Sequence, residues 1–142
     1  MKISTRGRYA LRVMIDLAEH CSEGYIPLQS VAERQGISNK YIENIMVDLS
    51  KSGIVDARHG KGGGYRLAKN AEDYSVAEIL KITEGDLAPV ECLSQGATPC
   101  DKVARCKTIG MWKEFNRLID DFFSKISIKD LTSAPLADEY II

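Results

Sequence analysis

Three cysteines, Cys92, Cys100 and Cys106, lie within a segment of fifteen residues. Thiolates at such spacing in a loop can converge on one soft metal centre. A zinc site would need four protein ligands, but the chain has only two histidines, His20 and His59, and both are distant in sequence. Three thiolates with one non-cysteine ligand suit an iron–sulfur cluster at least as well as zinc. Reduced structural thiols or redox-active thiols are the alternative, and the spacing favours a metal over them.

A second group of residues has the chemistry needed to bind DNA. An asparagine can form two hydrogen bonds with adenine, and a lysine can bind guanine or a phosphate. Residues 59–64 are cationic and rich in glycine, so this segment could enter the minor groove or bind phosphates. Its glycines permit positive φ and close approach of backbones. The candidate DNA-binding residues are Ser38, Asn39, Lys40, Tyr41, Glu43, Asn44, Arg58, His59, Gly60 and Lys61.

The periodicity of apolar residues predicts the elements that position these groups. Residues 5–20 have helical spacing, and residues 28–52 form two short helices, the second of them capped by Ser38. Two short strands, residues 54–58 and 65–68, flank the glycine-rich segment. A leading helix, a helix-turn-helix and a hairpin in that order predict a mainly α fold with a small β-hairpin wing, which is the winged helix-turn-helix.

Two other interpretations of this region are weaker. A helical interaction domain with a flexible loop would have a similar pattern, and single helix-turn-helix patterns are often misleading. A phosphate-binding loop would end in Gly-Lys-Ser or Gly-Lys-Thr, whereas Lys61 is followed by Gly62, and no βαβ unit surrounds this segment. The pattern therefore favours DNA binding.

The second half of the chain predicts two more helices around the cysteines. Residues 75–85 are helical, and Ser75 with Glu78 matches a capping box. Residues 108–126 have the longest helical pattern, and its apolar stripe needs something to cover it. We therefore expect three regions, a DNA-binding region at 1–85, a cysteine loop at 86–107, and a long helix with a tail at 108–142.

Composition and charge exclude several classes of protein. The 142 residues are 44% hydrophobic and 27% charged with a net charge of −1, which excludes a disordered chain and a uniformly basic DNA binder. Residues 1–69 hold 11 Lys and Arg against 7 Asp and Glu, whereas residues 70–142 hold 8 against 13, so the first half is expected to meet an anion. No apolar run approaches the roughly 18 residues of a membrane span, and the first residues do not resemble a signal peptide. We expect a cytoplasmic protein that is not an enzyme, with no membrane partner and no small-molecule substrate.

Three motifs taken together resemble the Rrf2 family of bacterial regulators. They are residues 1–10, the segment 35–43 with Gln-Gly-Ile-Ser followed by Tyr-Ile-Glu, and the segment 60–65 with Gly-Lys-Gly-Gly-Gly-Tyr. The three cysteines ahead of Trp112 resemble the iron–sulfur branch of this family. The resemblance covers residues 1 to about 131, and the combination is far more specific than any single motif.

The resemblance implies a homodimer in which the long helix is a dimerisation helix that pairs with its twin. It implies that the second helix of the helix-turn-helix and the wing recognise double-stranded DNA. It also implies an iron–sulfur cluster on Cys92, Cys100 and Cys106, and we expect a 2Fe–2S cluster rather than a 4Fe–4S cluster. The minor-groove arginine of related wings is replaced here by His59, with Arg58 beside it.

The fourth ligand of such a cluster departs from the family pattern. Some members supply a histidine three residues after the third cysteine, and others an aspartate from the partner's first helix; these positions hold Ile109 and Arg8 here. An oxygen donor such as Glu91 or Asp101, a residue from across the dimer, or a small thiol are the alternatives. The identity of the fourth ligand is therefore open.

These observations lead to a hypothesis with two alternatives. The hypothesis is a transcriptional regulator whose DNA binding depends on an iron–sulfur cluster that senses iron–sulfur, redox or nitric oxide status. One alternative is a cluster-free repressor of cysteine or sulfur metabolism controlled by a partner protein, because such a relative has a similar ending to residues 140–142. The other is an iron–sulfur carrier or redox protein in which the basic wing is incidental.

Overall fold

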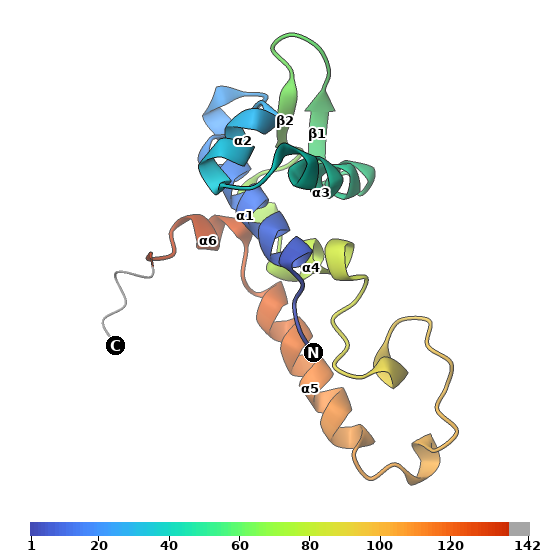
Figure 1. Ribbon diagram of the computed structural model, residues 1–142. Coiled ribbons are helices and arrows are strands. Elements are labelled where there is room, and N and C mark those ends of the chain that lie inside the picture. The colour runs from blue at the N-terminus through green and yellow to red at the C-terminus, as the bar shows by residue number, and fades with distance from the viewer. Residues whose placement is uncertain (137–142) are drawn as a thin grey trace.

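Helix α1 (Thr5–Glu19) lies at the centre of the amino-terminal part of the chain, with helices and the hairpin packed around it (Figure 1). The computed structural model describes residues 1–136. Ser4 caps α1 by accepting a hydrogen bond from the N–H of Gly7. The remaining elements are η1 (Cys21–Glu23), α2 (Leu28–Gln35), α3 (Asn39–Lys51), β1 (Val55–Arg58), β2 (Gly64–Leu67), η2 (Ala71–Asp73), α4 (Val76–Glu84), η3 (Glu91–Leu93), η4 (Val103–Arg105), α5 (Ile109–Ser124) and α6 (Ile128–Thr132), where η denotes a short 3-10 turn.

Helices α2 and α3 form the predicted helix-turn-helix. Gly36 ends α2 in the left-handed conformation with φ 64°, which glycine adopts without strain. Ser38 then caps α3 by accepting a hydrogen bond of 3.2 Å from the N–H of Tyr41. The core between α1, α2 and α3 consists of fully buried aliphatic side chains, Ala10, Val13, Met14, Leu17, Val31, Ile42, Ile45, Met46 and Leu49.

The wing is an antiparallel hairpin in which Val55 of β1 lies opposite Leu67 of β2. Strand β2 is also held by the segment ahead of α2, because Ile26 and Tyr65 exchange two backbone hydrogen bonds of 2.8 Å. A side chain at Gly64 would place its Cβ 2.2 Å from the carbonyl oxygen of Ile26, and one at Gly63 would lie 2.1 Å from the carbonyl oxygen of Arg58. The expectation that wing glycines allow close approach of backbones is therefore confirmed at these two positions.

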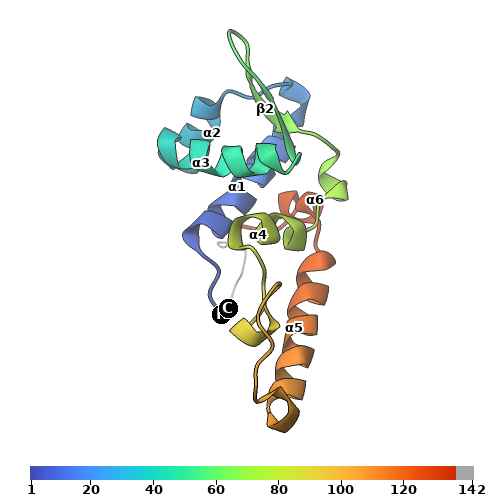
Figure 2. The ribbon, with the colours of Figure 1, turned by 90° about the vertical axis from the view of Figure 1, so that its right-hand side faces the viewer.

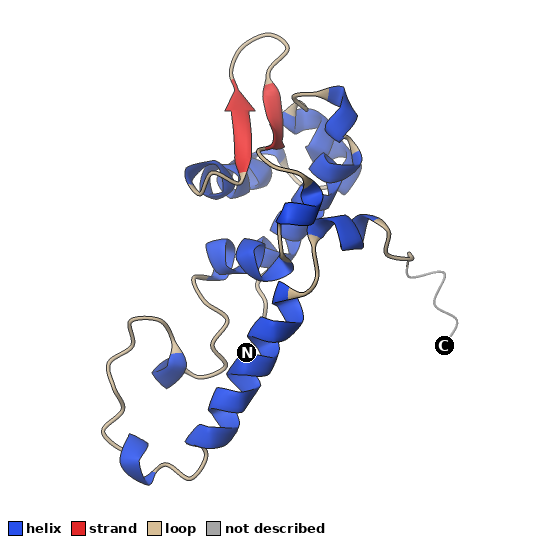
Figure 3. Cartoon of the chain, turned by 180° about the vertical axis from the view of Figure 1, so that it is seen from behind, coloured by secondary structure: helices blue, strands red, loops and turns tan. Residues whose placement is uncertain are grey.

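A second, smaller core joins α4 to the long helix α5. Its buried members are Val76, Leu80, Leu87 and Ile119. From this core α5 extends away from the winged helix, and the cysteine-bearing loop joins α4 to the far end of α5 (Figures 2 and 3). The loop and the wing consequently lie at opposite ends of the molecule (Figure 1).

The far side of α5 carries apolar side chains that nothing in residues 1–136 covers. Met111, Phe115, Leu118 and Phe122 are between 43% and 61% exposed. Their spacing of four, three and four residues places them on one stripe of the helix. The sequence-based prediction of an uncovered stripe is correct for these four residues, whereas Ile119 faces the second core.

Two predictions from the sequence need correction. The chain after α5 forms helix α6, which the sequence analysis did not predict; Ser127 and Asp130 cap it reciprocally, and Ile128 is fully buried. The capping box predicted for α4 is only half formed, because Ser75 accepts a hydrogen bond from the N–H of Glu78 without a return bond from the Glu78 side chain. The predicted feature at residues 140–142 lies outside the described residues. Within residues 1–136, the helices lack the length and apolarity that crossing a membrane requires.

Candidate DNA-binding surface and cysteine loop

The exposed start of α3 presents most of the residues predicted to contact DNA. Ser38, Asn39, Lys40, Glu43 and Asn44 are all exposed. Helix α3 packs against β1, so the hairpin stands beside it at the same end of the molecule (Figures 1 and 2). Arg58, His59, Gly60 and Lys61 are also exposed, at the tip of the hairpin. The structure thus brings the two predicted groups onto one end of the fold.

Tyr41 differs from the other predicted contacts because it is partly buried. Its ring meets that of Tyr9 edge to face, with ring centroids 5.5 Å apart. The guanidinium of Arg12 lies 5.1 Å from the centroid of Tyr9. Tyr41 therefore contributes to the contact between α1 and α3 in addition to any contact with DNA.

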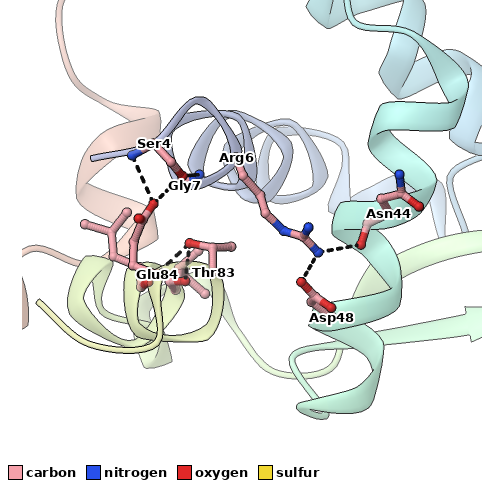
Figure 4. Close-up of polar contacts among 9 residues, drawn as sticks. Ser4, Arg6, Gly7, Asn44, Asp48, Thr83 and Glu84 are labelled. Atoms are coloured by element: carbon pink, nitrogen blue, oxygen red, sulfur yellow. Dashed lines mark hydrogen bonds and ion pairs between the residues drawn. The ribbon is translucent and has the colours of Figure 1, made fainter. Parts of the chain in front are cut away.

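Arg6 of α1 contacts α3, and the sequence analysis did not identify this contact. Its guanidinium donates to the backbone carbonyl of Asn44 at 3.2 Å and forms an ion pair with Asp48 (Figure 4). Arg6 stands four residues before Ala10 and seven before Val13, so it lies on the buried face of α1, although its charge is typical of a residue facing solvent. Only the tertiary arrangement shows that this arginine joins α1 to the recognition helix.

A buried ion pair joins α1 to α2. Asp16 is almost completely buried and accepts hydrogen bonds from Arg34 and Gln35. Burial raises the pKa of Asp16, but the hydrogen bonds from Arg34 and Gln35 and the charge of Arg34 outweigh burial and hold this pKa below its ordinary value. The helix-turn-helix is thus fixed to α1 by an ionised carboxylate.

An aromatic ring beside the wing lies close to two arginines. The guanidinium of Arg66 is 4.5 Å from the ring centroid of Tyr25, and that of Arg58 is 5.8 Å from it. Because a cation is attracted to the face of an aromatic ring, Tyr25 restrains the predicted DNA contact Arg58. The sequence carried no signal for this contact, since Tyr25 lies 33 residues before Arg58 in the chain.

All three clustered cysteines line one hollow in the loop between α4 and α5. The hollow has a volume of about 280 Å³, and Cys92, Cys100 and Cys106 share it with Leu93, Ala97, Pro99, Val103, Ile109 and Lys113. Within residues 1–136, however, no three His, Cys, Asp or Glu side chains are close enough together to hold a metal ion. The sequence predicted that these three thiols converge on one centre. The structure places them around one hollow, but not close enough together to bind one metal ion.

The candidate oxygen ligands Glu91 and Asp101 lie outside this hollow. Ile109 lines it but has no ligand atom, whereas Glu91 lines a neighbouring hollow with Cys92. Asp101 is exposed and is not among the residues that line either space. Cys21 lies elsewhere, in a hollow formed by residues 66–71 and Ala18.

Two polar contacts shape the cysteine loop. The hydroxyl of Thr108 lies 3.4 Å from the Sγ of Cys106, and hydrogen bonds from Thr108 lower the pKa of this thiol. The carboxylate of Asp86 accepts backbone N–H bonds of 3.0 Å from both Ala88 and Gln95, which lowers the pKa of Asp86. Asp86 thereby ties the two sides of the segment that carries Cys92.

The sequence of this chain is similar to those of known transcriptional regulators. The family model Rrf2, an iron-dependent transcriptional regulator, matches residues 3–134. The HTH-type transcriptional regulator IscR of Photorhabdus laumondii is 38% identical over 133 residues, which are 94% of this chain and 80% of that protein.

Solved structures give the same result for the fold. CymR, the global cysteine regulator of B. subtilis, matches with a TM-score of 0.75 and 29% identity over 94% of this chain and 97% of that chain. IscR of T. potens matches with a TM-score of 0.73 and 29% identity, over 100% of this chain and 93% of that one. The predicted winged-helix fold is confirmed by these similarities.

Proposed function

The chain belongs to the Rrf2 family of transcriptional regulators, and from this premise we propose that an iron–sulfur cluster in its cysteine loop controls its affinity for DNA. The chain is a DNA-binding transcriptional regulator with a winged helix. What we add is the cluster, the residues that hold it, and the dimer through which it acts. The observation that carries the proposal is the single hollow lined by all three clustered cysteines.

The donor atoms around this hollow are those of an iron–sulfur cluster, and the loop has to bring the three thiols closer together to bind it. Cysteine thiolates are the ligands that iron–sulfur clusters use in proteins, and Cys92, Cys100 and Cys106 supply three of them. Lys113 lines the same space and can offset part of their negative charge. When bound, the cluster supplies a centre that responds to oxidation, nitrosylation or iron shortage. The fourth ligand comes from outside the described hollow, from a small thiol, a partner protomer or a shifted Glu91 or Asp101, and we favour a 2Fe–2S cluster.

The apolar stripe of α5 is proposed as the surface that pairs with a second copy of the chain. Met111, Phe115, Leu118 and Phe122 repeat at the spacing of a coiled-coil seam. At the base of this stripe, Phe115, Leu118 and Phe122 also line an open groove of about 740 Å³ whose surface is mainly apolar. A twofold axis along this face would bury the same residues from both protomers.

A dimer explains how a distant cluster can control DNA binding. Two winged helices related by a twofold axis read two half-sites at a fixed spacing, so a small change in their separation changes affinity strongly. The cysteine loop directly connects α4 with the proposed dimer helix α5, and α4 packs on α1. A change in this loop is therefore expected to alter the relation between the two reading heads.

Anaerobic purification tests the cluster directly. The protein should carry iron and inorganic sulfide in a fixed ratio and absorb visible light, and Cys92→Ala, Cys100→Ala or Cys106→Ala should each abolish both. Cys21→Ala is the matched control and should retain the cluster, because Cys21 lies in a separate hollow. The iron content per protomer distinguishes 2Fe–2S from 4Fe–4S. Colourless, iron-free protein after anaerobic isolation and after reconstitution with iron and sulfide would refute the proposal.

A cluster-free repressor is the second candidate function. Its support is the fold similarity to CymR, a global cysteine regulator, together with the apolar Ile109 in the hollow. Such a protein would bind DNA equally well with all three loop cysteines replaced by alanine. Measuring the affinity of this triple variant for operator DNA therefore separates the two candidates.

A further inference from the structure

The first turn of α1 is capped by a residue from a distant part of the chain. Glu84, at the end of α4, accepts the backbone N–H of Ser4 at 3.1 Å and the hydroxyl of Ser4 at 2.5 Å (Figure 4). The Ser4 side chain in turn accepts the N–H of Gly7. In an ordinary capping box, a Glu or Gln at the third helical position returns the bond to the N-cap residue. Here Glu84 from α4 performs that role.

Gly7 leaves the space that Glu84 needs. It occupies the third helical position of α1, where the capping Glu or Gln would normally stand. A Cβ at Gly7 would lie 2.3 Å from the Oε1 of Glu84, closer than atoms can approach. Because Glu84 is a flexible side chain, a larger residue at position 7 would displace the carboxylate rather than bend α1. The absence of a side chain at Gly7 and the position of Glu84 therefore depend on each other.

The same turn of α1 contacts the recognition helix. Arg6 lies between Ser4 and Gly7 in this turn and donates to the carbonyl of Asn44 while pairing with Asp48 (Figure 4). Asn44 is also one of the residues predicted to contact DNA. One helical turn thus touches α4 through Ser4 and α3 through Arg6.

Glu84 also lies at the base of the cysteine loop. Only Gly85 separates it from Asp86, which binds the N–H groups of Ala88 and Gln95. One residue therefore connects Glu84 to the hydrogen-bonded start of the cysteine loop. The path continues through Ser4 and Arg6 to the start of the DNA-reading surface.

We propose that Glu84 caps α1 from outside the helix and, through the contact between Arg6 and Asn44, couples the cysteine loop to the recognition helix. This inference rests on the proposed function for the signal, but the cap and the contact with α3 exist without a cluster. Glu84, Gly7 and Arg6 are positioning residues, since none of them is placed in contact with the cluster or the bases. Because this turn of α1 contacts both α4 and α3, a change at either contact is expected to affect the other.

The test measures DNA affinity with and without the cluster in four proteins. Glu84→Ala should bring the ratio of the two affinities about fivefold closer to one, while iron content, visible absorbance and salt dependence remain those of the parent. Glu84→Gln keeps an acceptor oxygen and should restore most of the ratio. Glu78→Ala is the control, since Glu78 lies on the same helix and its side chain makes no hydrogen bond within residues 1–136. If the parent's DNA affinity depends on the cluster and Glu84→Ala leaves the ratio of the two affinities unchanged, the proposed coupling is overturned.

Hydrogen exchange in cluster-free protein tests the coupling when no cluster effect is found. Glu84→Ala should accelerate exchange of the amides in residues 5–8 and also in residues 44–48, whereas Glu78→Ala should leave both unchanged. Faster exchange confined to residues 5–8 would overturn the link to α3. This arm separates failure of the inference from failure of the proposed function, because it requires no cluster.

A compensating pair of variants provides the strictest check. Gly7→Ala should reproduce the effect of Glu84→Ala on α3, because the new methyl group displaces the carboxylate. In the background of Glu84→Ala, the same Gly7→Ala change should have no further effect on exchange at residues 44–48. Equal effects of Gly7→Ala in both backgrounds would show that the contact between these residues does not transmit anything.

Discussion

The guanidinium of Arg34 donates to both carboxylate oxygens of Asp16, with N–O distances of 3.0 and 2.7 Å. Asp16 is 1% exposed, in the last turn of α1, and the amide of Gln35 provides a third hydrogen bond at 2.9 Å. A buried carboxylate without such partners is strongly unfavourable. The pair therefore holds the end of α2 in one position on α1, immediately before the turn that leads to α3.

Removing the arginine should destabilise the fold measurably. Arg34→Ala leaves Asp16 buried with weaker partners, and we expect a loss of about 2 kcal/mol in the free energy of unfolding. This is below the 3–5 kcal/mol of a fully buried pair, because one third of the Arg34 side chain is exposed. Urea denaturation measures the change. Asp56→Ala, which removes the exposed pair with Arg66, is the control and should cost less than about 1 kcal/mol.

The same pair predicts how stability depends on pH. The folded pKa of Asp16 lies below its unfolded value, so ionised Asp16 stabilises the fold at neutral pH and down to about pH 4. This contribution is lost as the pH falls further, through the folded pKa. Arg34→Ala should therefore flatten the acid limb of a plot of stability against pH below about pH 5. An unchanged acid limb in this variant would mean that the pair does not set the pKa of Asp16.

The hairpin should tolerate no side chain at Gly64. Gly64→Ala would bring a Cβ to 2.2 Å from the carbonyl oxygen of Ile26, which is backbone and cannot move aside cheaply. We expect the two hydrogen bonds between Ile26 and Tyr65 to weaken, with a loss of about 2 kcal/mol and weaker DNA binding. Gly110→Ala is the contrasting change, because it lies within α5 with open space around it and should stabilise the helix by up to about 1 kcal/mol. Thermal unfolding of both variants compares them directly.

Helices whose boundaries depend on local chemistry were predictable from the sequence. Ser4, Ser38 and Ser75 each cap the helix that follows, because a serine side chain satisfies the free N–H groups of the first turn wherever that helix forms. Helix α6 carries the same local signal in Ser127 and Asp130, but the sequence analysis did not identify it because the helix has too few residues to show a periodic pattern. It is five residues long, and Ile128 is held by a backbone bond to Tyr74 and by burial in the main core. Such a short helix is stable only through tertiary contacts.

The candidate site shows the same division between local and distant information. Spacing alone indicated that Cys92, Cys100 and Cys106 belong to one loop, and the structure shows that all three line one hollow in it. The contact between Glu84 and Ser4 spans 80 positions in sequence, and the supporting role of Arg6 depends on a helix 38 positions away. A single sequence does not show which distant residue such a side chain contacts.

The exposed cations of α3 and of the wing should contribute separately to DNA binding. Lys40→Ala and Lys61→Ala should each weaken binding and reduce the slope of log affinity against log salt by about 1 if each contacts a phosphate. Tyr25→Leu should weaken binding less than Arg58→Ala does, because it frees Arg58 from its contact with the ring without removing the charge. Fluorescence anisotropy with a labelled duplex at several salt concentrations gives both quantities. If neither lysine changes the affinity, the reading surface has been placed wrongly.

The stripe on α5 provides the last prediction, since it tests the dimer independently of iron and of DNA. Leu118→Glu places a charge at the centre of the proposed interface, and in a twofold dimer the change occurs twice. Losing the burial of two leucines costs roughly 3 kcal/mol or more, so the dimer dissociation constant should rise more than hundredfold. Asn116→Glu adds the same charge to another face of α5 and should leave the dimer intact. Sedimentation equilibrium of both variants gives the result, and a Leu118→Glu protein that remains dimeric at micromolar concentration would place the interface on another surface.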